Sequence, residues 1–144
     1  MKPLSYRAII VAAVCGAAAA LMVNSVMIGA GFGEMNFSWM LGAVCLLVAA
    51  GAVWLGVQVA RYRRIQTREK VPHMGPILAA RAVAYAQGSI MTGALLTGWC
   101  AAILGYHVAM VSVRGFSVVF WEVLVNCVGS VALLIAGLWA QHCC

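Results

Sequence analysis

The segment RYRRIQTREKVPHMGPILAAR, residues 61–81, lies between two long apolar regions and carries most of the charge of this 144-residue chain. It holds six of the nine Lys and Arg residues, and Glu69 is its one acidic residue. The six basic residues are Arg61, Arg63, Arg64, Arg68, Lys70 and Arg81. Short loops rich in Lys and Arg stay on the cytoplasmic side of a membrane. We therefore predict that residues 61–81 form a cytoplasmic loop, which orients the apolar segments on either side.

The composition of the chain indicates an integral membrane protein. Charged residues make up 8% of the sequence, whereas a soluble domain has about 25%. A helix that spans a bilayer needs about 20 apolar residues, so four such helices would use the whole chain. We predict an all-α fold, a four-helix bundle in the membrane, with residues 1–144 as a single domain. The net charge of +6 favours contact with anionic lipid headgroups rather than with nucleic acid.

The apolar runs predict four spans, at about residues 8–28, 37–60, 82–111 and 118–140. The first run exceeds the 7 to 15 apolar residues of a typical signal peptide, so we expect it to be retained. Eight of the nine basic residues would then lie on one side of the membrane, with Arg114 alone on the other. This asymmetry predicts a multi-pass plasma membrane protein with both termini in the cytoplasm.

Small residues recur along the third predicted span at spacings of four. Small residues let transmembrane helices approach closely, so we expect the third helix to be the central one. The same face could instead serve contact with a second copy of the chain or with another membrane protein. The six residues predicted for helix packing are Ser89, Gly93, Ala94, Gly98, Ala101 and Gly105.

The start of this helix also carries a family resemblance. The run AARAVAYAQGSIMTGALLTG, residues 79–98, followed by Trp99, resembles an actinobacterial family of small membrane proteins classed as a domain of unknown function. The ending LWAQHCC, residues 138–144, resembles its mycobacterial and corynebacterial branch. The resemblance implies a four-helix protein of the plasma membrane and no assigned activity.

Two polar residues of the fourth span, Glu122 and Asn126, are four positions apart and share one helix face. Polar groups in hydrocarbon are costly, so each calls for an explanation. We expect Glu122 to pair with Arg114 across the external loop, and Asn24 of the first span to hydrogen-bond to the polar face. The alternative is a path for a transported solute past Glu122 and Asn126.

The cysteines and histidines indicate one further alternative. Cys15, Cys45, Cys100 and Cys127 fall within the spans, where a free cysteine behaves as a small apolar residue. The tail residues His142, Cys143 and Cys144, with His73 on the same side, are weak candidates for a metal or redox site, because thiolate and imidazole bind zinc and copper. An inert tail remains the simpler interpretation, since no C-x-x-C spacing is present.

No phosphate-binding glycine loop, acidic pair or serine nucleophile motif occurs in the sequence. We therefore expect no enzymatic activity and no cofactor. The favoured hypothesis is an accessory or scaffold subunit that acts through helix contacts and its basic loop, with the membrane lipid and either another membrane protein or a second copy as partners. The alternatives are a small transporter component and a metal or redox membrane protein.

Overall fold

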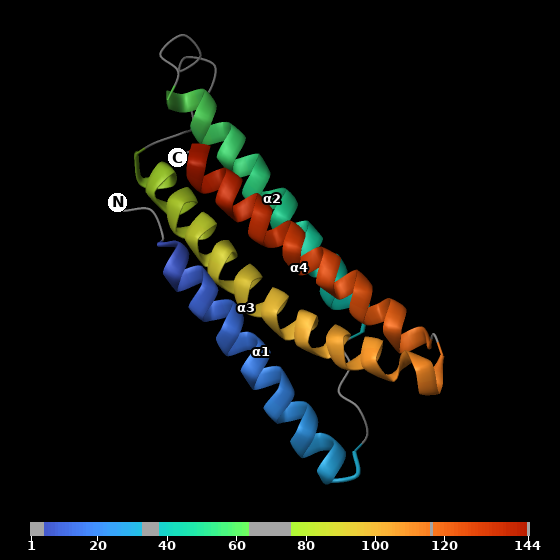
Figure 1. Cartoon of the computed structure of the whole chain (residues 1–144). Helices are drawn as coiled ribbons and strands as arrows, with labels where there is room; N and C mark the ends of the chain where they lie inside the picture. Colours follow the sequence, from blue (N-terminus) through green and yellow to red (C-terminus); the bar gives the residue numbers. More distant parts are fainter. Residues whose placement is uncertain (1–4, 33–37, 64–75, 116, 144) are drawn as a thin grey trace.

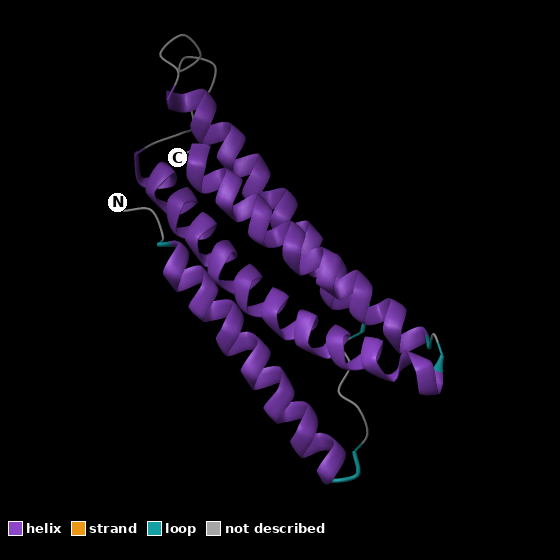
Figure 2. Cartoon of the chain, viewed as in Figure 1, coloured by secondary structure: helices purple, strands orange, loops and turns teal. Residues whose placement is uncertain are grey.

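A computed structural model describes residues 5–32, 38–63, 76–115 and 117–143, and these residues form four α-helices (Figure 2). The helices are α1 (Tyr6–Gly29), α2 (Met40–Arg63), α3 (Pro76–Arg114) and α4 (Val118–Cys143). Each is long and apolar enough to cross a membrane. The predicted all-α architecture of four helices, each long and apolar enough to cross a membrane, is therefore confirmed.

The helices extend into the predicted basic loop from both sides. α2 continues to Arg63 and α3 begins at Pro76, so residues 61–63 and 76–81 are helical, and Arg81 lies in the second turn of α3. Proline suits the first position of a helix, because its missing N–H would have no partner there. The remaining positions, 64–75, lie outside the described residues. With 39 residues, α3 is about 58 Å long, longer than the hydrocarbon core of about 30 Å.

Two helices end at a glycine with a left-handed backbone. After α1, Gly31 has φ +78°, and the N–H of Phe32 donates to the carbonyl of Met27 at 3.0 Å. After α3, Gly115 has φ +70°, and its N–H donates to the carbonyl of Val111 at 2.9 Å. Glycine adopts this conformation without the steric penalty of a Cβ atom. Both helices therefore stop where the chain must turn back across the bundle.

The third helix holds the bundle together. Within the described residues, α3 contacts each of the other helices, α2 and α4 also contact one another, and α1 contacts α3 alone. Figure 1 shows α1 on the side of α3 that faces away from α2 and α4. The expectation that the third helix is central is confirmed. The starts of α1 and α3 and the ends of α2 and α4 lie at the same end of the bundle (Figure 1).

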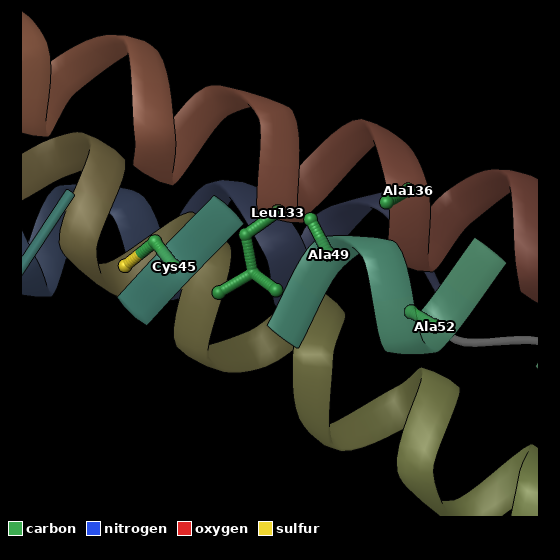
Figure 3. Packing of buried hydrophobic residues seen from close by; sticks show 5 residues of the cluster. All are labelled: Cys45, Ala49, Ala52, Leu133 and Ala136. Atoms are coloured by element: carbon green, nitrogen blue, oxygen red, sulfur yellow. The ribbon is translucent and has the colours of Figure 1, made fainter. Parts of the chain in front are cut away.

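The core is built mainly from small side chains. One cluster consists of Cys45, Ala49 and Ala52 on α2 with Leu133 and Ala136 on α4. Figure 3 shows the Leu133 side chain between Cys45 and Ala49. A second cluster joins α1, α3 and α4 through Ala20, Ile103 and Val123. Lipid tails are as apolar as these side chains, so the close packing of the helices, rather than removal of water, stabilises such a core.

Candidate functional site

Four of the six predicted packing residues of α3 lie at helix contacts. Ser89, Gly93, Ala94 and Gly98 are buried. A Cβ atom added to Gly93 would lie 2.8 Å from the backbone nitrogen of Leu134 on α4. One added to Gly98 would lie 3.0 Å from the Cα atom of Ala13 on α1. These two glycines therefore set the closest approach of α3 to its neighbours on two sides.

The other two predicted packing residues, Ala101 and Gly105, are exposed. No atom lies within 4 Å of a Cβ atom added to Gly105, and the same holds for Gly88 on α3. Both glycines are exposed in the folded chain. Ala101 and Gly105 thus form an exposed strip of small side chains on the part of α3 nearer its C-terminal end. Lipid or another helix can contact this strip.

Several close contacts involve glycines that the sequence analysis did not single out. A Cβ atom on Gly16 of α1 would lie 3.2 Å from the Cα atom of Leu95, next to the contact between Gly98 and Ala13. A Cβ atom on Gly129 of α4 would lie 3.0 Å from the Cα atom of Gly42 on α2. The sequence of α1 did contain a signal, because the small residues Ala12, Gly16 and Ala20 recur at every fourth position. In the structure these three residues and Asn24 are the buried residues of α1.

Asn126 is the best-defined polar group inside the bundle. Its side chain is 2% exposed. The backbone N–H of Gly42 donates to its Oδ1 at 2.7 Å, and its Nδ2 donates to the carbonyl of Ser38 at 3.4 Å. The N–H of Gly42 belongs to the first turn of α2, where no helical partner exists. Asn126, which belongs to α4, therefore caps the start of α2. In other helices this role is commonly filled by an Asn, Asp, Ser or Thr at the N-cap position of the same helix.

Glu122 and Ser130 lie one turn to either side of Asn126 on α4, whereas Asn24 lies on another helix. Glu122 is half-buried one turn from Asn126, and its predicted pairing with Arg114 stays a prediction, because the Arg114 side chain is outside the described part. Asn24 is buried on α1, whose neighbour is α3. Ser130 is buried and donates to the carbonyl of Cys127 in its own helix at 2.9 Å.

Three exposed arginines lie at the end of the bundle where α1 and α3 start and α2 and α4 end, which we call the terminal end. Arg7, Arg61 and Arg81 are exposed, and they belong to α1, α2 and α3. Arg63 ends α2. Three further predicted contact residues, Arg64, Arg68 and Lys70, lie outside the described residues. The exposed arginines described at this end thus come from three of the four helices.

The predicted metal or redox tail is described only in part. His142 is exposed in the last turn of α4, the side chain of Cys143 is not described, and Cys144 and His73 lie outside the described residues. Among the residues that the structure covers, no group of three His, Cys, Asp or Glu side chains is placed to hold a metal ion. Cys45 and Cys100 are buried in the spans, whereas Cys15 is exposed.

A small cavity of about 230 Å³ lies beneath the turn between α3 and α4. Its described walls are mainly apolar, and the buried His107 is the one residue with an imidazole among them. The walls include Met110, Val111, Val119 and Phe120. Acid–base chemistry needs a proton acceptor placed beside a second polar group. The described walls contain the imidazole of His107 and the hydroxyl of Ser117, and no carboxylate.

Exposed aromatic side chains mark both ends of the bundle. Trp39 and Trp121 are exposed near the starts of α2 and α4, and Tyr6, Trp54 and Trp139 are exposed toward the opposite end. Tyr and Trp gather at the two membrane–water interfaces, because their rings are apolar and their polar atoms stay hydrated. Together with the apolar surfaces between them, these two belts describe a protein that is built to cross a membrane.

The close helix contacts, the cap on α2 and the two belts of aromatic residues are features of a membrane protein. No curated protein and no solved structure matches the chain. Residues 9–144 match the model of the family described as Protein of unknown function (DUF3180), and because the match covers nearly the whole chain, the chain belongs to that family.

Proposed function

We propose that this protein is a non-enzymatic accessory or scaffold subunit of an actinobacterial plasma membrane. It binds another membrane protein through the exposed face of α3 and holds its basic end, with both termini, in the cytoplasm. The distribution of charge supports this orientation, since eight of the nine Lys and Arg residues belong to that end in sequence order.

The observation that carries the proposal is the exposure of Ala101 and Gly105. The contacts of α3 with α1 and α4 use Gly98 and Gly93, where an added Cβ atom would meet the neighbouring backbone. The same helix leaves Gly105 with open space around it. Transmembrane helices associate through small residues that permit close van der Waals contact. The strip at Ala101 and Gly105 offers such a contact to a helix from outside the chain.

The direct test is affinity purification of the whole chain from its own host in a gentle detergent or in native nanodiscs, followed by mass spectrometry. The proposal expects a second membrane protein in a stoichiometric amount. Recovery of the chain alone, as a monomer or as a homo-oligomer, would contradict an accessory role.

A matched pair of variants locates the contact. Gly105→Leu adds a bulky side chain where the folded chain has room, so the protein should fold and lose its partner. We expect a loss of about tenfold or more in co-purified partner, because a large side chain in a close helix contact costs about 1–3 kcal/mol. Gly88→Leu is the control, since Gly88 is equally open but lies more than four turns away along α3. Equal partner yields from both variants would exclude the strip at Ala101 and Gly105 as the binding face.

A further inference from the structure

Three exposed arginines at the terminal end have described side chains, and each comes from a different helix. Arg7 lies in the first turn of α1, Arg61 near the end of α2 and Arg81 in the second turn of α3. All three side chains are exposed. α1 and α2 contact α3 but not one another within the described residues. These three described arginines therefore belong to three different helices.

This end of the described structure carries no acidic side chain. Glu122 is the one acidic residue among the described residues, and it lies in the second turn of α4, toward the opposite end. The net charge of the described residues at the terminal end is thus strongly positive.

Neighbouring aromatic residues place these arginines near the surface of the bilayer. Tyr6 is 79% exposed and directly precedes Arg7, and the exposed Trp54 lies two turns before Arg61 on α2. Trp and Tyr rings occupy the headgroup level of a membrane. Arginine extends its apolar stem along the lipid and directs its guanidinium group outward. The guanidinium groups therefore reach the level of the lipid phosphates.

We propose that Arg7, Arg61 and Arg81 bind the phosphate groups of anionic phospholipids around the terminal end of the bundle. This inference rests on the proposed function and names the partner of its basic end. The planar guanidinium group donates two parallel hydrogen bonds to a phosphate. Lipids surround a membrane protein on every side and can reach all three arginines.

The test compares phosphatidylglycerol with phosphatidylcholine on the whole purified chain. The protein is reconstituted in nanodiscs that contain both lipids, released into a mild detergent and examined by native mass spectrometry. The wild type should retain phosphatidylglycerol in preference to phosphatidylcholine. In the triple variant Arg7→Gln/Arg61→Gln/Arg81→Gln this preference should fall by about fivefold for each arginine removed. High salt should weaken the preference in the wild type.

Two controls test whether the lipid preference depends on positive charge at the terminal end or on the total positive charge of the chain. Arg114→Gln removes an arginine from the opposite end of α3 and should leave the preference unchanged. The triple Arg→Lys variant keeps the positive charges and should retain most of the preference. Equal retention of the two lipids by the wild type, or an unchanged preference in the triple Gln variant, would overturn the proposal.

Two further outcomes identify a different ligand and also overturn it. One is a soluble glycerol phosphate that stabilises the lipid-free protein as strongly as phosphatidylglycerol does. The other is an acidic host protein that binds the wild type, but not the triple Gln variant, while no lipid preference is found. Neither result bears on Gly105→Leu, so the lipid proposal and the proposed helix contact can fail independently.

Discussion

At the scale of single residues, Asn126 links two helices through hydrogen bonds that lie within the bundle. Replacing it with Ala leaves the N–H of Gly42 and the carbonyl of Ser38 without the partners described above. We expect Asn126→Ala to lower the free energy of unfolding by about 1–2 kcal/mol. The measurement is reversible unfolding in mixed micelles, followed by a helix or tryptophan signal.

Ser130→Ala provides the matched control, because Ser130 is equally buried on α4 but donates to a carbonyl of its own helix. That carbonyl already accepts a helical hydrogen bond, so its loss should change the free energy of unfolding by less than about 0.5 kcal/mol. If the two variants lose the same stability, the cap on α2 contributes nothing beyond the removal of a buried polar group.

The sequence identified Asn126 as a polar residue in a span, but it could not identify its role. The cap joins positions 84 residues apart, and local sequence signals for a helix start extend over only a few positions. The interpretation as a polar face grouped Asn126 with Glu122, which lies one turn away on α4. The sequence did not show how α2 and α4 are aligned along their lengths. That alignment places the start of α2 against Asn126.

At the scale of helices, α1 depends on a single neighbour. Its closest approach to α3 lies at Gly16 and Gly98, and a side chain at either position would meet the backbone of the other helix. We expect Gly98→Ala to weaken the contact of α1 with α3 by about 1–3 kcal/mol. Hydrogen exchange should then accelerate in residues 6–29, while the exchange of α2 and α4, which do not contact α1 in the described structure, should stay unchanged.

Gly105→Ala serves as the control on the same helix, because its added methyl group meets no atom of the chain. Its exchange pattern should match that of the wild type throughout. Faster exchange in all four helices of the Gly98→Ala protein would instead show that α1 and the other helices unfold as one cooperative unit.

The helices themselves could be read from the sequence, since each is an apolar run long enough for a bilayer. The small residues of α3 were also visible as a pattern with a spacing of four. Their partners were not, because small-residue spacing indicates a contact face and does not say which helix covers it. Ala101 and Gly98 share the same pattern, yet one is exposed and the other lies against α1.

At the scale of the whole molecule, the bundle places the starts of α1 and α3 and the ends of α2 and α4 at one end (Figure 1). The chain charges then determine which way this end faces, because Lys and Arg are retained in the cytoplasm during insertion. We predict that a fluorescent protein fused after Cys144 is fluorescent and that alkaline phosphatase fused there is inactive. Fusion in the turn between α3 and α4, after Gly115, should give the opposite pair of results.

The same charges supply a stricter test of this orientation. Replacing Arg61, Arg63, Arg64, Arg68 and Lys70 with Gln leaves Lys2, Arg7 and Arg81 as the basic residues of the predicted cytoplasmic side, against Arg114 on the other. The bias falls from eight against one to three against one, so a mixture of orientations should appear, with measurable phosphatase activity after Cys144. Adding Arg114→Gln to that variant removes the opposing charge and should restore a single orientation. A variant that stays uniformly oriented without the five charges would show that the apolar helices, and not the basic segment, set the topology.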